Sequence, residues 1–597
     1  MSLAAAGPWW RRADWGALLV LGVVLASSAA GLGNGFAYDD VPIVQMNDRV
    51  SALRWPWEYF TETYWSPPWG AALYRPVTIL LFALQWRVAD WAAVTFHVVN
   101  VTVYAVAALL LLRLARTLVR PAIALGLAVL WVAHPVHVEV VGNVVGQSEL
   151  WVLVSSLVAI DVWRRALAAQ VITWRTFAGL LACVAVALGA KESGIVLPVI
   201  LGAMWVADLA QRGWTAPGPP RAALLLRAMC YLVVLYLGAR YAVLGSLGGD
   251  VAHSAIVHMP TAPRMLVALG LVLDDARLLF WPGVLRADYS PPSFAIHPAW
   301  GLAHVLALLL VLGAVLSLRA LHRARCAAWP AVWGGLALLP TSNLLFATGV
   351  VLAERSLFVP SVGIALLVGQ LVDLVLDRFG AQIRPGVRRL ALAGVAVVAV
   401  LWGRASAERQ GVWADSPTLI ASSVVEDRGN PRWQRVLGVH FLRLREWDRA
   451  EAHFRAAAAL ASGDFHVVFG MVRVLERQGR CVEALEWYAR LLNEFPPTTR
   501  AYMGQVACQL MVRRFREARR NAIGARAGGF DPAPFAILVA LADSMLRATD
   551  SLPSGVGPGV VRDAEEPLRL EIDDAGRLTR RDPVQARLVV PPGGKAQ

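Results

Sequence analysis

Two adjacent carboxylates near the N-terminus are the residues best suited to acid–base chemistry. Asp39 and Asp40 lie in the string G-F-A-Y-D-D-V-P-I, which follows an apolar run as long as a membrane span. Neighbouring carboxylates repel each other, so one of them can keep a raised pKa and accept a proton. The pair therefore predicts a catalytic base, although an acidic loop without catalysis would carry the same two residues.

The rest of this loop contributes aromatic rings and a cation. Trp55, Trp57 and Tyr59 precede the string Y-R-P-V-T, which contains Arg75. A guanidinium binds phosphate through two parallel hydrogen bonds, and aromatic faces suit a sugar ring. The loop thus favours a site for a sugar and a phosphate, with Arg75 as a phosphate ligand.

A second polar segment reads H-P-V-H-V-E-V-V-G-N-V-V-G-Q-S-E. Its candidates for binding a sugar or an acceptor are His137, Glu139, Asn143 and Glu149. His134 and His137 have H-x-x-H spacing, but Pro135 disfavours a helix that would turn both rings toward one metal. We predict no metal site. A hydrogen-bonded pair of His137 and Glu139 that only shapes the loop is the structural alternative.

Further polar residues stand at the ends of later apolar runs. Lys191 is followed by Glu192 and is either a phosphate ligand or half of an ion pair between helices. Asp288, in D-Y-S, and Asn343, in T-S-N, are candidates for binding the sugar or the acceptor. Arg355, in E-R, is a third candidate for phosphate, with a salt bridge at a helix end as its alternative.

The elements that must position these residues are membrane helices. Of the 597 residues, 57% are hydrophobic, against about 45–50% in soluble domains. Eleven apolar runs are long enough to cross a bilayer. They lie at about residues 15–33, 96–112, 118–134, 145–163, 174–190, 194–210, 222–245, 299–318, 327–346, 356–376 and 388–404. The fold predicted is all-α and polytopic.

Arginine placement predicts the orientation of these spans. The net charge of +14 is almost wholly arginine, because Lys191 and Lys595 are the only lysines. Every loop that the count places inside is arginine-rich, beginning with Arg11 and Arg12, which follows the positive-inside rule. The charge therefore sets topology and does not indicate nucleic-acid binding. An odd number of spans leaves the C-terminal part outside.

Two other apolar stretches, 77–86 and 265–281, do not fit this count and are taken as re-entrant or interfacial helices. The second carries Asp274, Asp275 and Arg277, which are costly at mid-bilayer.

The composition is typical of a GC-rich bacterial genome. We therefore expect a multi-pass protein of the bacterial inner membrane with a cytoplasmic N-terminus.

After residue 430 a repeat with a period of 34 appears. Trp447, Cys481 and Phe515 are spaced by 34, and the pattern is similar to tetratricopeptide repeats. The predicted domains are a membrane domain at 1–410, a linker at 411–429, repeats at 430–545 on the periplasmic side, and a disordered tail at 546–597. Cys481 and Cys508 could approach each other in such a stack, as a disulfide or as buried thiols.

The ordered set of motifs resembles the integral-membrane glycosyltransferases of the GT-C architecture. It is most similar to the transmembrane and tetratricopeptide-repeat O-mannosyltransferases and their bacterial relatives. The strings that carry the resemblance are F-A-Y-D-D, Y-R-P-V-T, H-P-V-H-V-E-V-V-G-N-V-V-G-Q-S-E-L, K-E-S-G, D-Y-S and S-N-L-L-F-A-T-G-V-V-L-A-E-R-S-L-F-V-P-S, followed by the repeats. Together they cover roughly residues 30–545. Two departures, a short repeat array and D-Y-S in place of D-W-S, bear on the acceptor more than on the reaction.

The resemblance implies sugar transfer, with mannose expected, from a polyprenyl-phosphate donor to a serine or threonine hydroxyl. Asp39 would be the general base and Asp40 its supporting carboxylate. A hydroxyl has a high pKa and needs such a base, and the departing lipid phosphate needs nearby cations. Arg75, Lys191 and Arg355 would supply them. A single displacement inverts the anomeric carbon, and neither a nucleotide nor another cofactor is required, with a divalent cation left open.

Two alternatives remain at this level. The acceptor could be an envelope glycan or lipid, or the chain could be a non-catalytic membrane scaffold whose repeats recruit partners. A scaffold would not need polar motifs crowded on one face of the membrane. The partners expected are the lipid-linked sugar, the bilayer and an acceptor polypeptide presented by the repeats.

Overall fold

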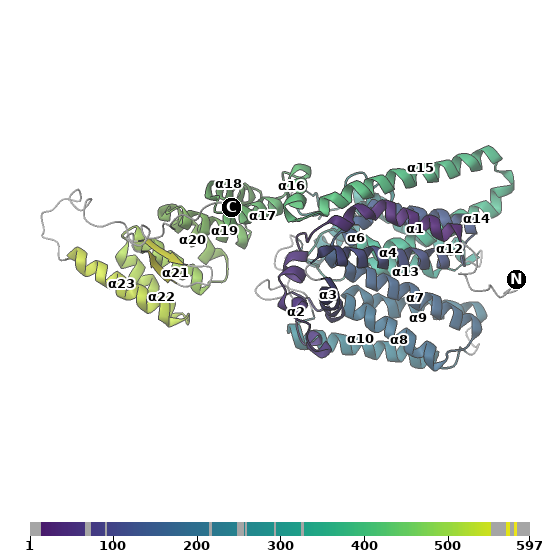
Figure 1. The fold of residues 1–597 in the computed structure, drawn as a ribbon, viewed down its shortest axis with the longest axis horizontal. Helices are drawn as coiled ribbons and strands as arrows, with labels where there is room; N and C mark the ends of the chain where they lie inside the picture. The colour runs from purple at the N-terminus through teal and green to yellow at the C-terminus, as the bar shows by residue number, and fades with distance from the viewer. Residues whose placement is uncertain are drawn as a thin grey trace, which may run out of the picture. The chain divides into compact units, whose positions relative to one another are not determined.

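The computed structural model divides the chain into two compact units, Met1–Glu426 and Asp427–Gln597 (Figure 1). The residues described are 14–65, 73–89, 92–213, 218–247, 256, 259–291, 294–323, 327–461, 463–550, 569–572 and 578–581. Arg11 and Arg12, used above to orient the first span, lie outside them, as does most of the tail after residue 550.

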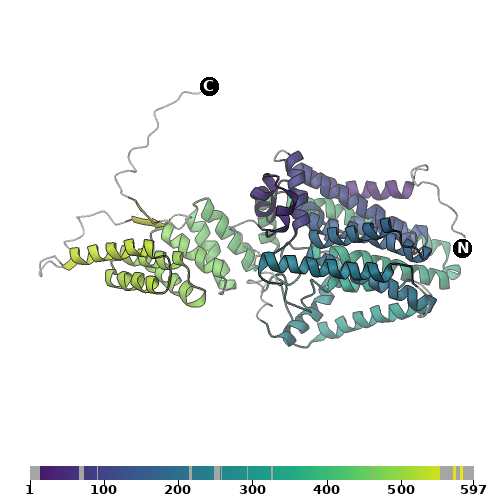
Figure 2. The ribbon, with the colours of Figure 1, turned by 90° about the horizontal axis from the view of Figure 1, so that it is seen from below.

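The first unit is built of helices that run alongside one another (Figures 1 and 2). Its α-helices are α1 (Trp15–Ser28), α2 (Asp48–Ser51), α3 (Pro76–Ala89), α4 (Ala93–Ala115), α5 (Pro121–Ala133), α6 (Val138–Gly142), α7 (Gln147–Ala169), α8 (Trp174–Ala190), α9 (Val196–Arg212), α10 (Ala222–Leu244), α11 (Thr261–Phe280), α12 (Leu302–Arg323), α13 (Trp329–Leu338), α14 (Phe358–Phe379), α15 (Pro385–Gln410) and α16 (Ser416–Glu426). Helix α7 packs against α4, α8 and α9, so the core lies around it.

Seven helices of the described residues are long and apolar enough to cross a membrane, or eight if the bent pair of α5 with Pro135–Gly142 counts as one span. The chain is therefore an all-α polytopic membrane protein, as the hydropathy predicts. Each of the eleven predicted runs falls on a helix, but α8 has 17 residues and α13 only 10. The count of eleven remains a prediction.

The two doubtful stretches are also helical. The first lies in α3, a short apolar helix of 14 residues, and the second lies in α11, which does not meet the criterion for a span. Close packing between helices uses small residues, as is usual in membranes. A Cβ on Gly363 of α14 would lie 2.4 Å from the backbone nitrogen of Gly334 in α13. Glycine is therefore needed where these two helices meet.

The second unit consists of paired helices. They are α17 (Pro431–Arg443), α18 (Trp447–Leu460), α19 (Phe465–Arg477), α20 (Cys481–Glu494), α21 (Thr499–Met511), α22 (Phe515–Ala527) and α23 (Pro532–Asp550). The first helices of successive pairs begin 34 residues apart, at Pro431, Phe465 and Thr499. This spacing supports tetratricopeptide-like repeats.

Two strands, β1 (Arg569–Ile572) and β2 (Leu578–Arg581), pair antiparallel in the segment whose composition predicts disorder. The rest of that segment after Asp550 lies outside the described residues. Helix α23 ends five residues beyond the predicted boundary of the repeats at 545.

Candidate active site

Asp39 lies in a strained turn. Tyr38 has a φ of 50°, in the left-handed region that a bulky residue rarely adopts, and its N–H donates to Ser416 Oγ at 2.8 Å. Directly after Asp40 comes η3 (Val41–Gln45), a turn of π-helix. Strained residues and π-helical turns both concentrate at functional sites. The turn keeps the Asp39 side chain partly buried, beside a rigid backbone.

Asp40 points into the protein and joins two loops. Its side chain is fully buried and accepts hydrogen bonds from the N–H groups of Ala37 (3.2 Å), Val144 (3.2 Å) and Val145 (2.8 Å). Burial raises the pKa of Asp40 to about 7, against the effect of these three donors, and the Asp39 charge raises it further. The carboxylate with the raised pKa is therefore the buried one, Asp40, and its hydrogen bonds hold it away from a substrate.

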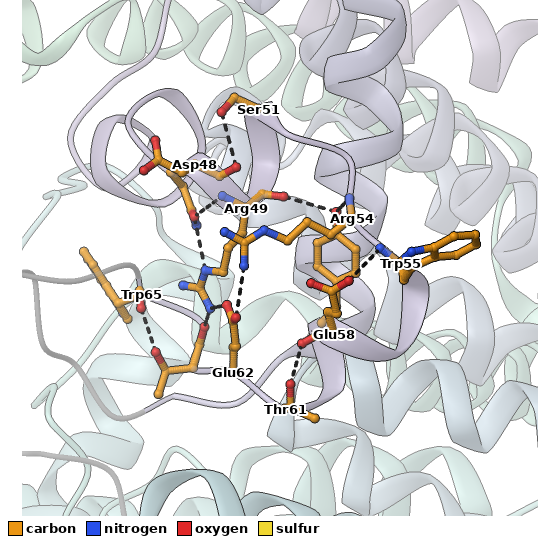
Figure 3. Close-up of polar contacts among 12 residues, drawn as sticks. Asp48, Arg49, Ser51, Arg54, Trp55, Glu58, Thr61, Glu62 and Trp65 are labelled. Carbon is orange, nitrogen blue, oxygen red and sulfur yellow. Dashed lines mark hydrogen bonds and ion pairs between the residues drawn. The ribbon is translucent and has the colours of Figure 1, made fainter.

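The loop between α1 and α3 is stiffened by a network of ion pairs and hydrogen bonds (Figure 3). The buried Arg49 guanidinium lies 3.2 Å from Glu62 and donates to Asn47 Oδ1 at 3.3 Å. Arg54 reaches the other oxygen of Glu62 at 3.1 Å, and Tyr59 Oη donates to the Arg49 carbonyl at 3.1 Å. The network ties η4 (Pro56–Phe60) to the residues that flank it in the same loop.

Two aromatic rings project from this stiffened segment. Trp55 and Trp57 stack with ring centroids 5.0 Å apart, and their side chains are 66% and 62% exposed. An exposed, preorganised indole pair of this kind is available to a ligand. It fits the aromatic surface that the sequence predicts.

Arg75 forms a two-pronged ion pair with Glu192. Its Nε lies 2.9 Å from one carboxylate oxygen and its terminal nitrogen 2.7 Å from the other. The guanidinium also lies over the Tyr64 ring, 4.9 Å from the centroid. Burial would lower the pKa of Arg75, but the Glu192 charge outweighs burial and raises it. The Arg75 charge is thus fixed in place by Glu192.

The Tyr64 phenol responds to several charges. Burial raises its pKa, the Arg75 charge lowers it, and the charges of Asp39 and Asp40 raise it. Of these groups, Arg75 lies over the ring.

The other two cations also pair with carboxylates. Lys191 Nζ contacts Glu149 in a buried pair that joins the end of α8 to the start of α7. Burial lowers the pKa of Lys191, whereas the Glu149 charge opposes that effect. Arg355 contacts Glu139 through its side chain and through its N–H at 2.8 Å. Lys191 and Arg355 thus form ion pairs with partners outside their own strings.

His137 and Glu139 do not pair with each other. His137 is buried and hydrogen-bonds Tyr104 Oη at 3.1 Å and Ser361 Oγ at 3.2 Å, which ties α4 to α14. Glu139 instead forms an ion pair with Arg355. Within the described part of the chain, no group of three or more His, Cys, Asp or Glu side chains could hold a metal ion.

The three remaining candidates differ in how they are held. Asn143 is 5% exposed, and its Oδ1 has no hydrogen-bond partner among the described residues. Asn343 uses both amide atoms inside its own loop, donating to the carbonyls of Val350 and Val351 and accepting from Thr348 at 2.8 Å. Asp288 is buried. Asn143 therefore has spare bonding capacity for a ligand, whereas Asn343 shapes a loop.

A pocket opens beside the Lys191 pair. Glu149 and Ser193 lie at its polar side, and Ser193 Oγ is buried with no partner among the described residues. Its apolar walls come from α7, α9, α13 and α14, with Val152, Leu197, Trp333 and Val359 among the lining residues. Ser156, Thr341 and Ser356 also line the pocket, and its volume of about 10 Å³ is close to what one water molecule needs.

Two braces near the site were not predicted. Glu354 accepts two hydrogen bonds from Arg409, both at 3.0 Å, and one from Tyr289 Oη at 2.9 Å. The cluster fastens the D-Y-S loop and the end of α15 to the start of η8 (Glu354–Leu357). The pairing of Arg75 with Glu192 was also missed. The sequence shows only that charged residues lie in or beside apolar runs. It does not show which of these residues form pairs.

The chain is similar in sequence to several named protein O-mannosyl-transferases. The chain is 24% identical to protein O-mannosyl-transferase TMTC3 of Mus musculus over 501 residues, 78% of this chain and 53% of that protein. It is 26% identical to protein O-mannosyl-transferase F38B6.6 of Caenorhabditis elegans over 368 residues, 59% of this chain and 50% of that protein. The chain resembles the TMTC protein O-mannosyl-transferases.

The human TMTC3 enzyme gives a similar match, 24% identity over 512 residues, 80% of this chain and 55% of that protein. The chain therefore spans about half the length of the curated relatives it matches. No family model and no solved structure matches it.

Proposed function

We propose that the chain is a GT-C-type glycosyltransferase that moves a sugar, mannose in the first instance, from a polyprenyl phosphate to a serine or threonine hydroxyl of a protein. The names of its relatives support mannosyl transfer to protein. The observation that carries the proposal is the strained turn at Tyr38, in which Asp39 is partly buried while three N–H groups hold Asp40 in the interior.

Asp39 acts as the general base in this scheme. It takes the proton of the acceptor hydroxyl as the oxygen attacks the anomeric carbon, and the bond from that carbon to the phosphate oxygen breaks on the opposite face. The configuration at carbon is inverted. Asp40 cannot substitute, because it is fully buried and already accepts three N–H groups.

The departing phosphate carries away the electron pair and requires positive charge. Arg75 is the first candidate, because its guanidinium offers a planar fork and is fixed in place by Glu192. Lys191 and Arg355 follow, and the charges of both Arg75 and Arg355 act on Lys191. Fixed cations of this kind stabilise charge as it develops. The scheme needs no nucleotide, since the lipid phosphate already activates the sugar.

Lys191, which is held by Glu149 at the start of α7, is placed to attract the phosphate of the donor. Asn143, with an unused carbonyl oxygen, is the candidate for a sugar hydroxyl.

We place the site on the periplasmic side of a bacterial inner membrane, with the repeats outside and available to hold an acceptor polypeptide. The arginine pattern supports this orientation. Paired helices form extended concave surfaces that suit an unfolded segment.

The test is transfer of mannose from polyprenyl-phosphate mannose to candidate polypeptides by the purified chain. Asp39→Asn is expected to lower the rate by about 10²-fold or more, as for loss of a general base. Asp48→Asn is the matched control, because Asp48 is an exposed carboxylate of the same loop. Asp40→Asn should cost less than Asp39→Asn.

Near-normal turnover by Asp39→Asn, with normal yield and melting temperature, would remove Asp39 from catalysis. Transfer to a glycan or lipid but to no polypeptide would change the acceptor class. If neither acceptor class is modified while the repeats capture a partner, the scaffold alternative would hold.

A further inference from the structure

Two cysteines of the second unit meet in its core. Cys481 begins α20 and Cys508 lies in the last turn of α21. Their sulfur atoms are 2.8 Å apart, and both side chains are buried, 3% and 0% exposed. Non-bonded carbon atoms sit about 3.5–4.0 Å apart, and sulfur is larger. The two thiols are thus held closer than ordinary packing requires.

The surroundings of the pair are well determined by packing. Both cysteines belong to one apolar cluster with Tyr488, Met471 and Leu475. Tyr488 is fixed in turn by a hydrogen bond to Glu476. The helices that carry the cysteines are neighbours in the chain and pack together. The packing of α20 against α21 therefore already holds the two sulfur atoms against each other.

We propose that Cys481 and Cys508 form an intramolecular disulfide that fastens α20 to α21. Two thiols become one sulfur–sulfur bond and release two protons and two electrons. The electrons reduce the disulfide of a thiol–disulfide oxidoreductase to its dithiol. Such partners act outside the cytoplasm, so the proposal rests on the proposed outer location of the repeats but not on the transferase reaction.

Burial determines when the bond forms. A folded stack hides both sulfur atoms from an oxidoreductase, so pairing must precede closure of the stack around Tyr488. Once formed, the bond is shielded from reductant for the same reason. The disulfide is therefore a permanent structural cross-link in the repeats and not a redox switch.

The disulfide should also raise the thermal stability of the second unit. The cysteines are 27 residues apart in the chain. A loop of that size is long enough for a cross-link to restrict the unfolded chain appreciably. We expect the melting temperature of the second unit to fall by on the order of 10 °C when the link is removed.

The direct test uses the wild-type full chain, purified from membranes after free thiols are blocked during lysis in denaturant. Trypsin cuts after Arg480, Arg490, Arg500 and Arg513, so the two cysteines fall in separate peptides, 481–490 and 501–513. Without reductant these peptides should appear linked by mass spectrometry. Cys183 and Cys230, free cysteines of the first unit, should be alkylated in the same sample.

A second measurement compares Cys481→Ala, Cys508→Ala and the double variant with wild type. All three should melt at the same lowered temperature, because either change removes the whole link. Cys230→Ala, an exposed position, is the matched control and should melt as wild type does.

Alkylation of both Cys481 and Cys508 in the native chain would overturn the proposal, as would a bond from either one to another copy of the chain. An alkaline phosphatase fusion after Asp550 separates the causes. Free thiols with an active fusion would refute the disulfide and leave the outer location standing. Free thiols with an inactive fusion would refute both. Neither result would touch the assignment of Asp39.

Discussion

Asp39 and Asp40 are neighbours with different environments. Asp40 is enclosed by three N–H donors and has a pKa of about 7, because burial outweighs those donors. Asp39 remains partly buried in the turn. The sequence predicts that one carboxylate of the pair has a raised pKa, but it cannot tell which, since that depends on the loop at Val144 and Val145, about a hundred residues away.

The pairing of Arg75 with Glu192 sets a condition on donor binding. A phosphate at Arg75 must share the guanidinium with Glu192 or displace it. Removing the Glu192 charge should therefore strengthen donor binding, whereas Arg75→Lys should weaken it by about 10-fold or more, because an ammonium lacks the bidentate fork. We expect Glu192→Gln and Arg75→Lys to change the affinity for unglycosylated polyprenyl phosphate in opposite directions.

The competing role of Arg75 is a structural brace for the first loop. In that case both variants would lower the melting temperature, because Glu192→Gln leaves the Arg75 charge without its partner and Arg75→Lys loses the two-pronged geometry of the pair. Donor affinity would then fall in both. Arg404→Ala is the control, because its pair with Glu408 is exposed and should affect neither quantity.

For several candidate site residues, the sequence indicates a polar or charged side chain but not the residue that this side chain contacts. The polar strings were visible because charged side chains are rare in apolar runs. Their contacts join segments far apart in the sequence, such as Lys191 with Glu149 and Arg355 with Glu139. Local spacing carries no information on such pairs. Asn343, chosen by its string, turns out to bond within its own loop.

At the scale of elements, prolines are the most informative residues. Pro135 disfavours a straight continuation of the helix that ends at Ala133, and the following segment is bent by 51°. Helix α13 ends at Leu338, just before Pro340 and the polar triplet T-S-N, although the predicted apolar run continues to residue 346. Hydropathy measures composition and does not show where a backbone leaves the helix.

Gly470 of α19 is a sharp test of the repeat packing. A Cβ there would lie 2.4 Å from the ring of Phe454, which is fully buried in the preceding helix pair. Gly470→Ala should therefore destabilise the second unit by about 1–3 kcal/mol through overpacking. Chemical unfolding followed by far-UV circular dichroism measures the change.

Gly524→Ala is the matched change with the opposite expected sign. Gly524 lies inside α22, and a Cβ there meets nothing within 4 Å. Alanine should stabilise that helix by up to about 1 kcal/mol. Equal effects of the two substitutions would contradict the close approach of α19 to Phe454, and with it the helix pairing described above.

At the scale of the whole molecule, the number of spans decides which side the repeats face. The arginine pattern requires an odd number before residue 430. Length and composition alone identify seven or eight spans among the described residues. The choice depends on α3, α7, α8, α11 and α13, each of which is too short or too polar to be assigned by hydropathy.

A periplasm-restricted reporter resolves this. Alkaline phosphatase fused after Asp550, where α23 ends, should be active, and the same enzyme fused after Gly213, where the arginine pattern predicts the inside, should be inactive. The physical reason is the charge of the short loops, because reversing the chain would move at least three arginine-rich loops to the outside. The fusion after Gly213 and one after Arg286 test the two doubtful helices separately, with a fusion after Met46, before either helix, as the active reference. If α3 spans, the fusion after Gly213 becomes active. If only α11 spans, activity is lost after Arg286 and after Asp550 alone. An inactive fusion after Asp550, with full-length protein in the membrane, would put the repeats on the side opposite Asp39 and contradict their proposed role in presenting the acceptor.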